Sequence, residues 1–170
     1  MSVPPEVVAA ITSKKAKYGR YADLKQWDKF EAEVALPDCK MAYLGHDGAP
    51  LQIGKTRFVF DRAVDMTAFF AKFFAPMQTL HNIGPGDFEA SPTGQADEVR
   101  AIFGFEDQIL MPPLGLWVNI RGGGYYTETW KEVNGSWFLK DLVMQRTYQQ
   151  ESFLVTIVLA LQNLTGISFL

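Results

Sequence analysis

The spacing of apolar residues near the N-terminus predicts two helices. Pro4 and Pro5 suit the first turn of a helix. Apolar residues then recur at roughly helical spacing: Val7, Ile11, Tyr18 and Ala22. Four basic residues fall elsewhere on this helix and are expected on its surface: Lys14, Lys15, Lys17 and Arg20. The helix is predicted to end near Asp23, and a second short helix over about 26–34 would bury Trp27 and Phe30.

A strand over 39–44 and a third helix follow. The helix has the clearest pattern in the chain, because five apolar residues follow the i, i+3, i+4, i+7, i+8 spacing: Met66, Phe69, Phe70, Phe73 and Phe74. Asp65 is expected to cap its N-terminus, and Pro76 ends it.

From residue 78 onward the pattern changes to strands. They are expected over 79–83, 88–91, 99–111, 117–133 and 136–144. Asn134 and Gly135 between the last two are typical of a type I′ hairpin turn. Helices followed by an antiparallel meander indicate an α+β fold, and residues 1–170 are interpreted as one domain.

The C-terminal stretch over 153–161 is apolar on all sides. It is too short for a bilayer, which needs about 20 residues, so no membrane span is expected. Residues 150–170 are interpreted as a buried helix or lid, or alternatively as a subunit interface or membrane contact.

Composition narrows the possible functions. A net charge of -3 and a pI near 5.4 give no basic surface for nucleic acid. The aromatic share of 14% suggests a bulky core or a lined pocket. Cys39 is the single cysteine, so no disulfide can form within the chain, and a reducing compartment follows; without a recognisable signal peptide, the cytoplasm is expected.

Common cofactor motifs are not recognisable. Glycines at 84 and 86 lack the spacing of a phosphate-binding loop, and the glycines at 122–124 lead into a strand rather than a helix. The two histidines, His46 and His81, show no metal-ligand spacing with other donors. No cofactor and no metal are therefore expected.

A series of motifs resembles the scytalone dehydratase and SnoaL-like family, a branch of the cone-shaped superfamily that includes nuclear transport factor two. The motifs are YGRYADLKQWDKF at 18–30, Tyr43 on a strand, TLHNIG at 79–84 and the hairpin WKEVNGSW at 130–137. The resemblance spans residues 7–145 and depends on their order. It implies a cone-shaped α+β barrel, with N-terminal helices packed on a strongly curved, mixed but mainly antiparallel sheet that encloses a pocket.

The resemblance also implies an acid–base pair. In the family an Asp at the end of the first helix pairs with a His on a strand, and Asp23 and His81 match those positions. A carboxylate bonded to one ring nitrogen leaves the other free to move a proton. Tyr43 matches a tyrosine that helps to polarise a substrate carbonyl.

Strand alternation adds candidates around the pocket. Glu128 and Tyr126 share one face of their strand, so Glu128 is a candidate for a second acid or base and Tyr126 for substrate binding. Glu106 and Asp107 point to opposite faces, so either one of them can enter the pocket, and Asp107 is the candidate for substrate binding. The remaining substrate-binding candidates are Trp27, Phe70 and Trp117.

The sequence also departs from scytalone dehydratase. Ala22 replaces a second tyrosine, Gly124 and Tyr126 replace a Ser and an Asn, and no second histidine occurs at 106–110. Scytalone is therefore not expected as the substrate. We expect a cofactor-free dehydratase, cyclase or isomerase of secondary metabolism, acting on a polycyclic polyketide, terpenoid or alkaloid intermediate. The alternative is a non-catalytic binding or dimerisation module, and a homodimer or homotrimer is implied in either case.

Overall fold

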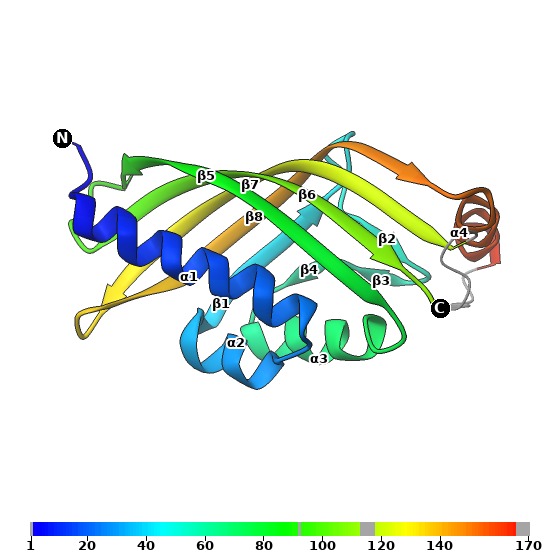
Figure 1. Ribbon diagram of the computed structural model, residues 1–170, viewed down its shortest axis with the longest axis horizontal. Helices are drawn as coiled ribbons and strands as arrows, with labels where there is room; N and C mark the ends of the chain where they lie inside the picture. The colour runs from blue at the N-terminus through cyan, green and yellow to red at the C-terminus, as the bar shows by residue number, and fades with distance from the viewer. Residues whose placement is uncertain (1, 92, 113–117, 166–170) are drawn as a thin grey trace.

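The computed structural model describes residues 2–91, 93–112 and 118–165. Its N-terminal half holds three helices, α1 (Pro5–Asp23), α2 (Trp27–Glu33) and α3 (Ala63–Phe73). α1 begins with Pro5 in its first turn, as expected, and ends before Lys25, which has a positive φ of 57°. The three helices pack together and against the sheet (Figure 1).

The sheet is mixed and open. Its strands lie in the order β4 (Val59–Phe60), β1 (Ala35–Leu44), β8 (Ser136–Glu151), β7 (Asn119–Val133), β6 (Glu98–Leu110) and β5 (Gln78–Ala90). Only the β1–β8 pair is parallel within this sheet, and β4 and β5 form its two edges. Two short strands, β2 (Gln52–Ile53) and β3 (Thr56–Arg57), form a separate hairpin. The α+β cone is confirmed, whereas a fully closed barrel is not formed.

Long strands bend around the interior of the cone. β5 continues through the stretch predicted as a gap, with its register shifted between Ile83 and Gly86. The turn between β7 and β8 has positive φ angles at both Asn134 and Gly135 (51° and 77°), as the type I′ prediction requires. β8 runs seven residues further than the predicted end at Met144, and this extension brings Arg146 onto the sheet.

Two predictions about charged residues in the helices are wrong. Lys15 is only 1% exposed, although its charge suggested the surface, because its ammonium group reaches a carboxylate inside the core. Asp65 does not cap α3: the extended Arg62 precedes the helix, and the Asp65 carboxylate accepts two hydrogen bonds from the Arg62 side chain (2.7 and 2.8 Å) instead.

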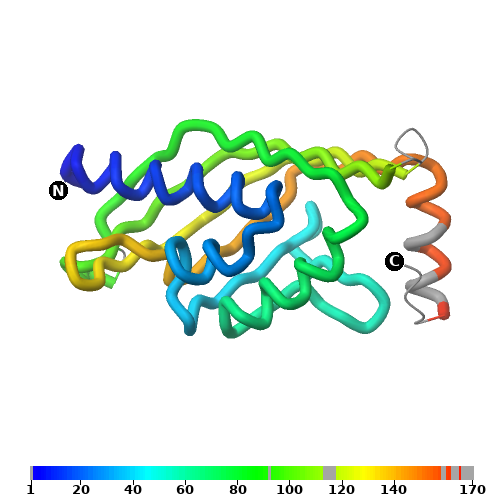
Figure 2. Tube along the Cα trace, turned by 60° about the horizontal axis from the view of Figure 1, so that its bottom comes forward, coloured from blue at the N-terminus to red at the C-terminus, as the bar shows by residue number. Residues whose placement is uncertain are grey.

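The C-terminal helix α4 (Phe153–Thr165) stands at the far end of the sheet from the N-terminus of α1 (Figures 1 and 2). Val155 is buried, but Phe153 is 78% exposed, and Leu154, Ile157 and Leu161 are also exposed. The expected buried helix is therefore wrong for this described part. No helix in the described ranges is long and apolar enough to cross a membrane.

Candidate functional site

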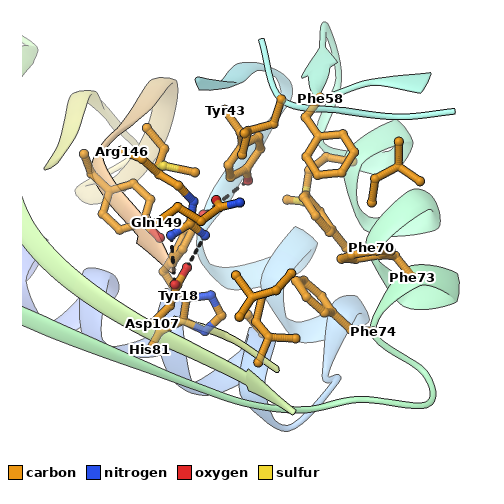
Figure 3. A pocket seen from close by; sticks show the side chains of 18 of the residues that line it. Tyr18, Tyr43, Phe58, Phe70, Phe73, Phe74, His81, Asp107, Arg146 and Gln149 are labelled. Carbon is orange, nitrogen blue, oxygen red and sulfur yellow. Dashed lines mark hydrogen bonds and ion pairs between the residues drawn. The ribbon is translucent and has the colours of Figure 1, made fainter. Parts of the chain in front are cut away.

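A cavity of about 120 Å³ lies between the concave face of the sheet and the helices. Figure 3 shows two unlike sides: aromatic rings from α3 and its neighbourhood on one, polar side chains from the strands on the other. An engineered cavity of about 150 Å³ admits benzene, so the inner space accommodates about one ring. The apolar side is formed by Phe58, Phe70, Phe73 and Phe74, and the polar side by His81, Asp107, Arg146 and Gln149.

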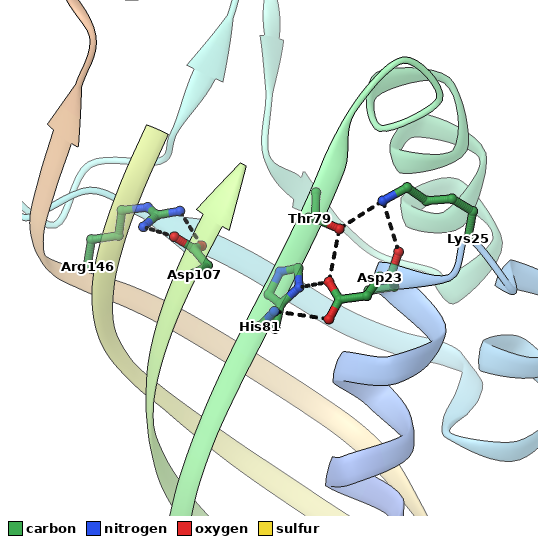
Figure 4. A network of polar contacts seen from close by, with 7 residues as sticks. Asp23, Lys25, Thr79, His81, Asp107 and Arg146 are labelled. Atoms are coloured by element: carbon green, nitrogen blue, oxygen red, sulfur yellow. Dashed lines mark hydrogen bonds and ion pairs between the residues drawn. The ribbon is translucent and has the colours of Figure 1, made fainter. Parts of the chain in front are cut away.

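Asp23 and His81 meet where the end of α1 packs on β5. His81 Nδ1 lies 2.7 Å from Asp23 Oδ1, and the His81 backbone N–H donates to Oδ2 at 3.0 Å. Thr79 Oγ1 donates to Oδ1 at 2.9 Å and itself accepts from Lys25 Nζ at 2.8 Å (Figure 4). Three contacts thus hold the Asp23 carboxylate, and one of them is to the His81 ring, its partner by the order of the family motifs.

The surroundings of Asp23 keep its carboxyl ionised. Burial raises its pKa, but hydrogen bonds from His81 and Thr79 outweigh burial and hold the pKa below its ordinary value. An ionised carboxylate accepts the Nδ1 proton of a neutral imidazole. His81 Nε2 has no hydrogen-bond partner among the described residues, and the His81 ring lines the cavity.

Two buried phenols form a second polar group in the cavity. Tyr43 and Tyr18 both line it, and their hydroxyl oxygens lie 3.2 Å apart. Burial raises the pKa of each phenol well above its ordinary value, so both stay protonated. Tyr18 was not predicted as a site residue, but it lies four residues before Ala22 and hence on the same face of α1. Tyr18 thus supplies a phenol on the helix face where Ala22 replaces the second tyrosine of scytalone dehydratase.

An ion pair completes the polar side of the cavity. Arg146 on β8 binds Asp107 on β6 through two parallel hydrogen bonds of 2.9 and 2.6 Å. Asp107 faces the cavity, and Glu106 is exposed on the other face. Arg146 was not predicted as a site residue, although the alternation of Leu142 and Met144 extends to it and places it on the inner face.

The other predicted binding residues have mixed outcomes. Tyr126, Trp27 and Phe70 line the cavity, and the Trp27 ring stacks on Phe70 and Phe74. Trp27 Nε1 is a buried donor with no partner in the described part of the chain. Trp117 lies outside the described residues.

Glu128 is in a different place from the one expected. It is buried on the inner face of β7, as alternation required, but it is not among the residues that line the cavity. Lys15 binds one carboxylate oxygen, and Trp130 Nε1 donates to the other at 2.9 Å. The expected place of Glu128 in the pocket lining is therefore corrected: helix α1 covers this part of the strand and fills the space with Lys15.

No group of three or more potential metal ligands occurs within the described ranges. Among the described residues, the polar groups of the cavity wall instead include one imidazole, three phenols, two amides and one ion pair. Such groups bind oxygen atoms and transfer protons.

Comparison with known proteins yields one close relative in sequence. The probable cyclase FGR4 of Gibberella zeae is 36% identical over 149 residues, which cover 87% of this chain and 96% of the relative. No family model matches the chain.

Solved structures share the fold at low sequence identity. An aromatic ring hydroxylase-like protein of Novosphingobium aromaticivorans has a TM-score of 0.73 at 15% identity, covering 89% of this chain and 96% of its own. A scytalone dehydratase-like protein of the same organism has a TM-score of 0.66 at 14% identity, covering 84% and 85%. The hexachlorocyclohexane dehydrochlorinase LinA, type 2, has a TM-score of 0.66 at 16% identity, covering 84% and 86%. The chain therefore belongs to the same family as the probable cyclase FGR4, and it shares the fold of the scytalone dehydratase-like and LinA structures.

Proposed function

We propose that this protein is a cofactor-independent acid–base enzyme in which His81 moves a proton at the wall of an apolar cavity. One observation carries the proposal: the Asp23 carboxylate holds His81 Nδ1 at 2.7 Å while the ring borders the cavity. This arrangement favours the tautomer with its proton on Nδ1, and it leaves the Nε2 lone pair available to a substrate.

The first step is the removal of a proton from a carbon next to a carbonyl group. His81 Nε2 takes the proton, and the electron pair of the C–H bond moves onto the carbonyl oxygen to form an enolate. The resulting imidazolium is stabilised by the ionised Asp23. Tyr43, supported by Tyr18, donates a hydrogen bond to the enolate oxygen without ionising.

The second step decides the type of product. In a dehydration, the enolate electrons expel a hydroxyl group from the neighbouring carbon, and His81 returns its proton so that water leaves. In an isomerisation, the proton returns to another carbon of the same conjugated system. In a cyclisation, the enolate carbon attacks the carbon of a second carbonyl group, the C–O π electrons move onto that oxygen, and the oxygen takes the proton from His81. The relative, a probable cyclase, favours the cyclised product.

The cavity wall suggests the kind of substrate. Rings of Phe70, Phe74 and Trp27 can stack against a flat, largely apolar molecule. We propose a polycyclic polyketide, terpenoid or alkaloid intermediate of secondary metabolism, with part of the molecule in the inner space and the rest toward its opening.

The exposed apolar residues of α4 support a second, compatible role. Phe153, Leu154, Ile157 and Leu161 present apolar surface at the end of the sheet. We propose a homo-oligomer, with a dimer and a trimer as the two alternatives. A purely non-catalytic module would not require the fixed Asp23–His81 pair beside a cavity.

Deuterium exchange tests the proton transfer without knowledge of the natural substrate. Protein in D₂O is mixed with three cyclic ketones, 1-indanone, 1-tetralone and 4-chromanone, and loss of the proton signal next to the carbonyl is followed by NMR. The protein is expected to accelerate exchange of at least one ketone. H81Q is expected to lower this acceleration by roughly 10²–10⁴-fold.

The chain offers a matched control, because His46 is the second histidine and lies outside the Asp23–His81 contacts. H46Q is expected to exchange like the unaltered protein. Equal exchange rates in H81Q and the unaltered protein for all three ketones would sink the proposal.

A further inference from the structure

The Asp107–Arg146 pair is a polar element of the cavity that the proposed proton transfer does not use. Both side chains are buried, with Asp107 8% and Arg146 5% exposed, and both border the cavity. A buried ion pair is a weak source of stability, because desolvation offsets most of the attraction. Its place in the cavity wall therefore suggests a role in binding.

The pair is built across three strands. Gly122 on β7 lies between Asp107 on β6 and the strand that carries Arg146, and it lies directly opposite Asp107. A Cβ atom on Gly122 would lie 1.9 Å from Arg146 Nη1. Glycine at this position thus leaves the space through which the guanidinium reaches Asp107, and this explains one glycine of the run at 122–124 as part of a site.

The pair also lies next to the Asp23–His81 pair. His81 on β5 is directly opposite Asp107 on β6 in an antiparallel register, and opposite side chains on one face have Cβ atoms about 4.5–5.5 Å apart. Figure 4 shows the Asp107–Arg146 pair beside His81, on the side away from Asp23. A ligand atom held at this pair would place the adjacent carbon atoms near His81 Nε2.

Arg146 retains an unused donor. Its Nη1 and Nη2 atoms bind Asp107, but its Nε atom is buried without a hydrogen-bond partner among the described residues. A buried donor without a partner is unfavourable, and a ligand that satisfies it gains affinity. The guanidinium can therefore offer one further N–H to a bound molecule.

The charge balance of the pair indicates which group it binds. One carboxylate already neutralises the guanidinium, so a second anion would add negative charge to a buried site. A neutral hydroxyl group fits better, because its oxygen can accept from Arg146 Nε without adding charge, while Asp107 keeps the guanidinium neutralised.

We propose that Asp107 and Arg146 form a hydroxyl-binding subsite, and that the substrate carries a neutral hydroxyl group in addition to the carbonyl group that enolises. This inference rests on the proposed function, because it specifies the substrate of the same cavity. Under it, Tyr43 binds the enolising oxygen and the Asp107–Arg146 pair binds the second oxygen.

The test compares the binding of matched probes by ligand-observed NMR titration. The probes are 1-indanone, its 4-, 5-, 6- and 7-hydroxy derivatives, and the carboxylic acids substituted at the same carbons. At least one hydroxyindanone is expected to bind about tenfold more tightly than 1-indanone, equivalent to about 1.4 kcal/mol. Its carboxylate counterpart is expected to bind more weakly.

Three variants connect this preference to the pair. R146M/D107L removes both charges together, so that no buried carboxylate is left unpaired, and it is expected to bring the affinity ratio close to one. G122A is expected to lower the ratio by displacing the guanidinium. G104A is the matched control on β6, because a Cβ there meets only Tyr125 at 3.7 Å, and it should keep the ratio.

Two results would overturn the subsite. One is an unchanged hydroxyl preference in folded R146M/D107L, and the other is a carboxylate that binds more tightly than the matching phenol. H81Q separates the two proposals, since it should lose deuterium exchange while it keeps the hydroxyl preference. If H81Q loses deuterium exchange but neither the unaltered protein nor any variant prefers the hydroxyindanones, the subsite is contradicted and the proposed proton transfer still stands.

Discussion

Two groups of buried charges lie on the concave side of the sheet, and they differ in what their polar atoms contact. In the core, Lys15 and Trp130 bind the two oxygens of Glu128, and the Lys15 ammonium group also lies 3.4 Å from the centre of the Tyr126 ring. In the cavity wall, His81 Nε2 and Arg146 Nε keep free hydrogen-bonding capacity within the described structure. Burial and charge alone therefore do not identify a functional group; unused hydrogen-bonding capacity at a cavity does.

The largest effect on catalysis is expected from changes to His81 and its partner Asp23. D23N is expected to reduce ketone deuterium exchange by roughly 10²–10⁴-fold, because an amide cannot stabilise the imidazolium and can favour the wrong tautomer. Thermal unfolding should show that the variant is folded. An exchange rate within a factor of two of the unaltered protein would mean that Asp23 only supports the fold.

The core group should affect stability instead. K15M leaves the Glu128 carboxylate buried without its cation, and we expect it to lower the free energy of unfolding by about 3–5 kcal/mol in urea titrations. The double variant K15M/E128L removes both charges and should recover most of this loss. If K15M alone were neutral, the contrast between the two groups would fail.

Low pH should have a smaller effect, on the contribution of Asp23 to stability. The pKa of folded Asp23 lies below its ordinary value of 3.8, so its contribution to stability is present above that value and is lost as the pH falls through the folded pKa. The stability difference between the unaltered protein and D23N should therefore shrink as the pH falls below about 4. A difference that grows as the pH falls below about 4 would contradict the direction of the shift.

Local patterns predicted much of the fold. The helical spacing in α1 and α3, the two-residue turn at Asn134 and Gly135, and the order of helices before strands all act over short distances, and all agree with the structure. The position of Asp23 opposite His81 followed from the order of family motifs rather than from periodicity. Residues 58 positions apart show no local signal of contact.

Long-range partners account for what the sequence could not predict. Lys15 seemed a surface residue because its partner, Glu128, lies 113 positions away. Arg146 was missed because β8 was predicted to end at Met144, and because its role depends on space left by Gly122 on the next strand. Alternation predicts which face a side chain occupies, but not how deep in a cone it lies or which helix covers it.

The most direct test of the central claim is the tautomer of His81. In ¹⁵N-labelled H46Q, His81 is the single remaining imidazole, and two-bond ¹H–¹⁵N correlation spectra at pH 8 show which ring nitrogen carries the proton. The account predicts a protonated Nδ1 that donates to Asp23 and an unprotonated Nε2 facing the cavity, and D23N should weaken this preference. A proton on Nε2 in the H46Q protein would leave no base available to the substrate, and it would contradict the proposed proton transfer.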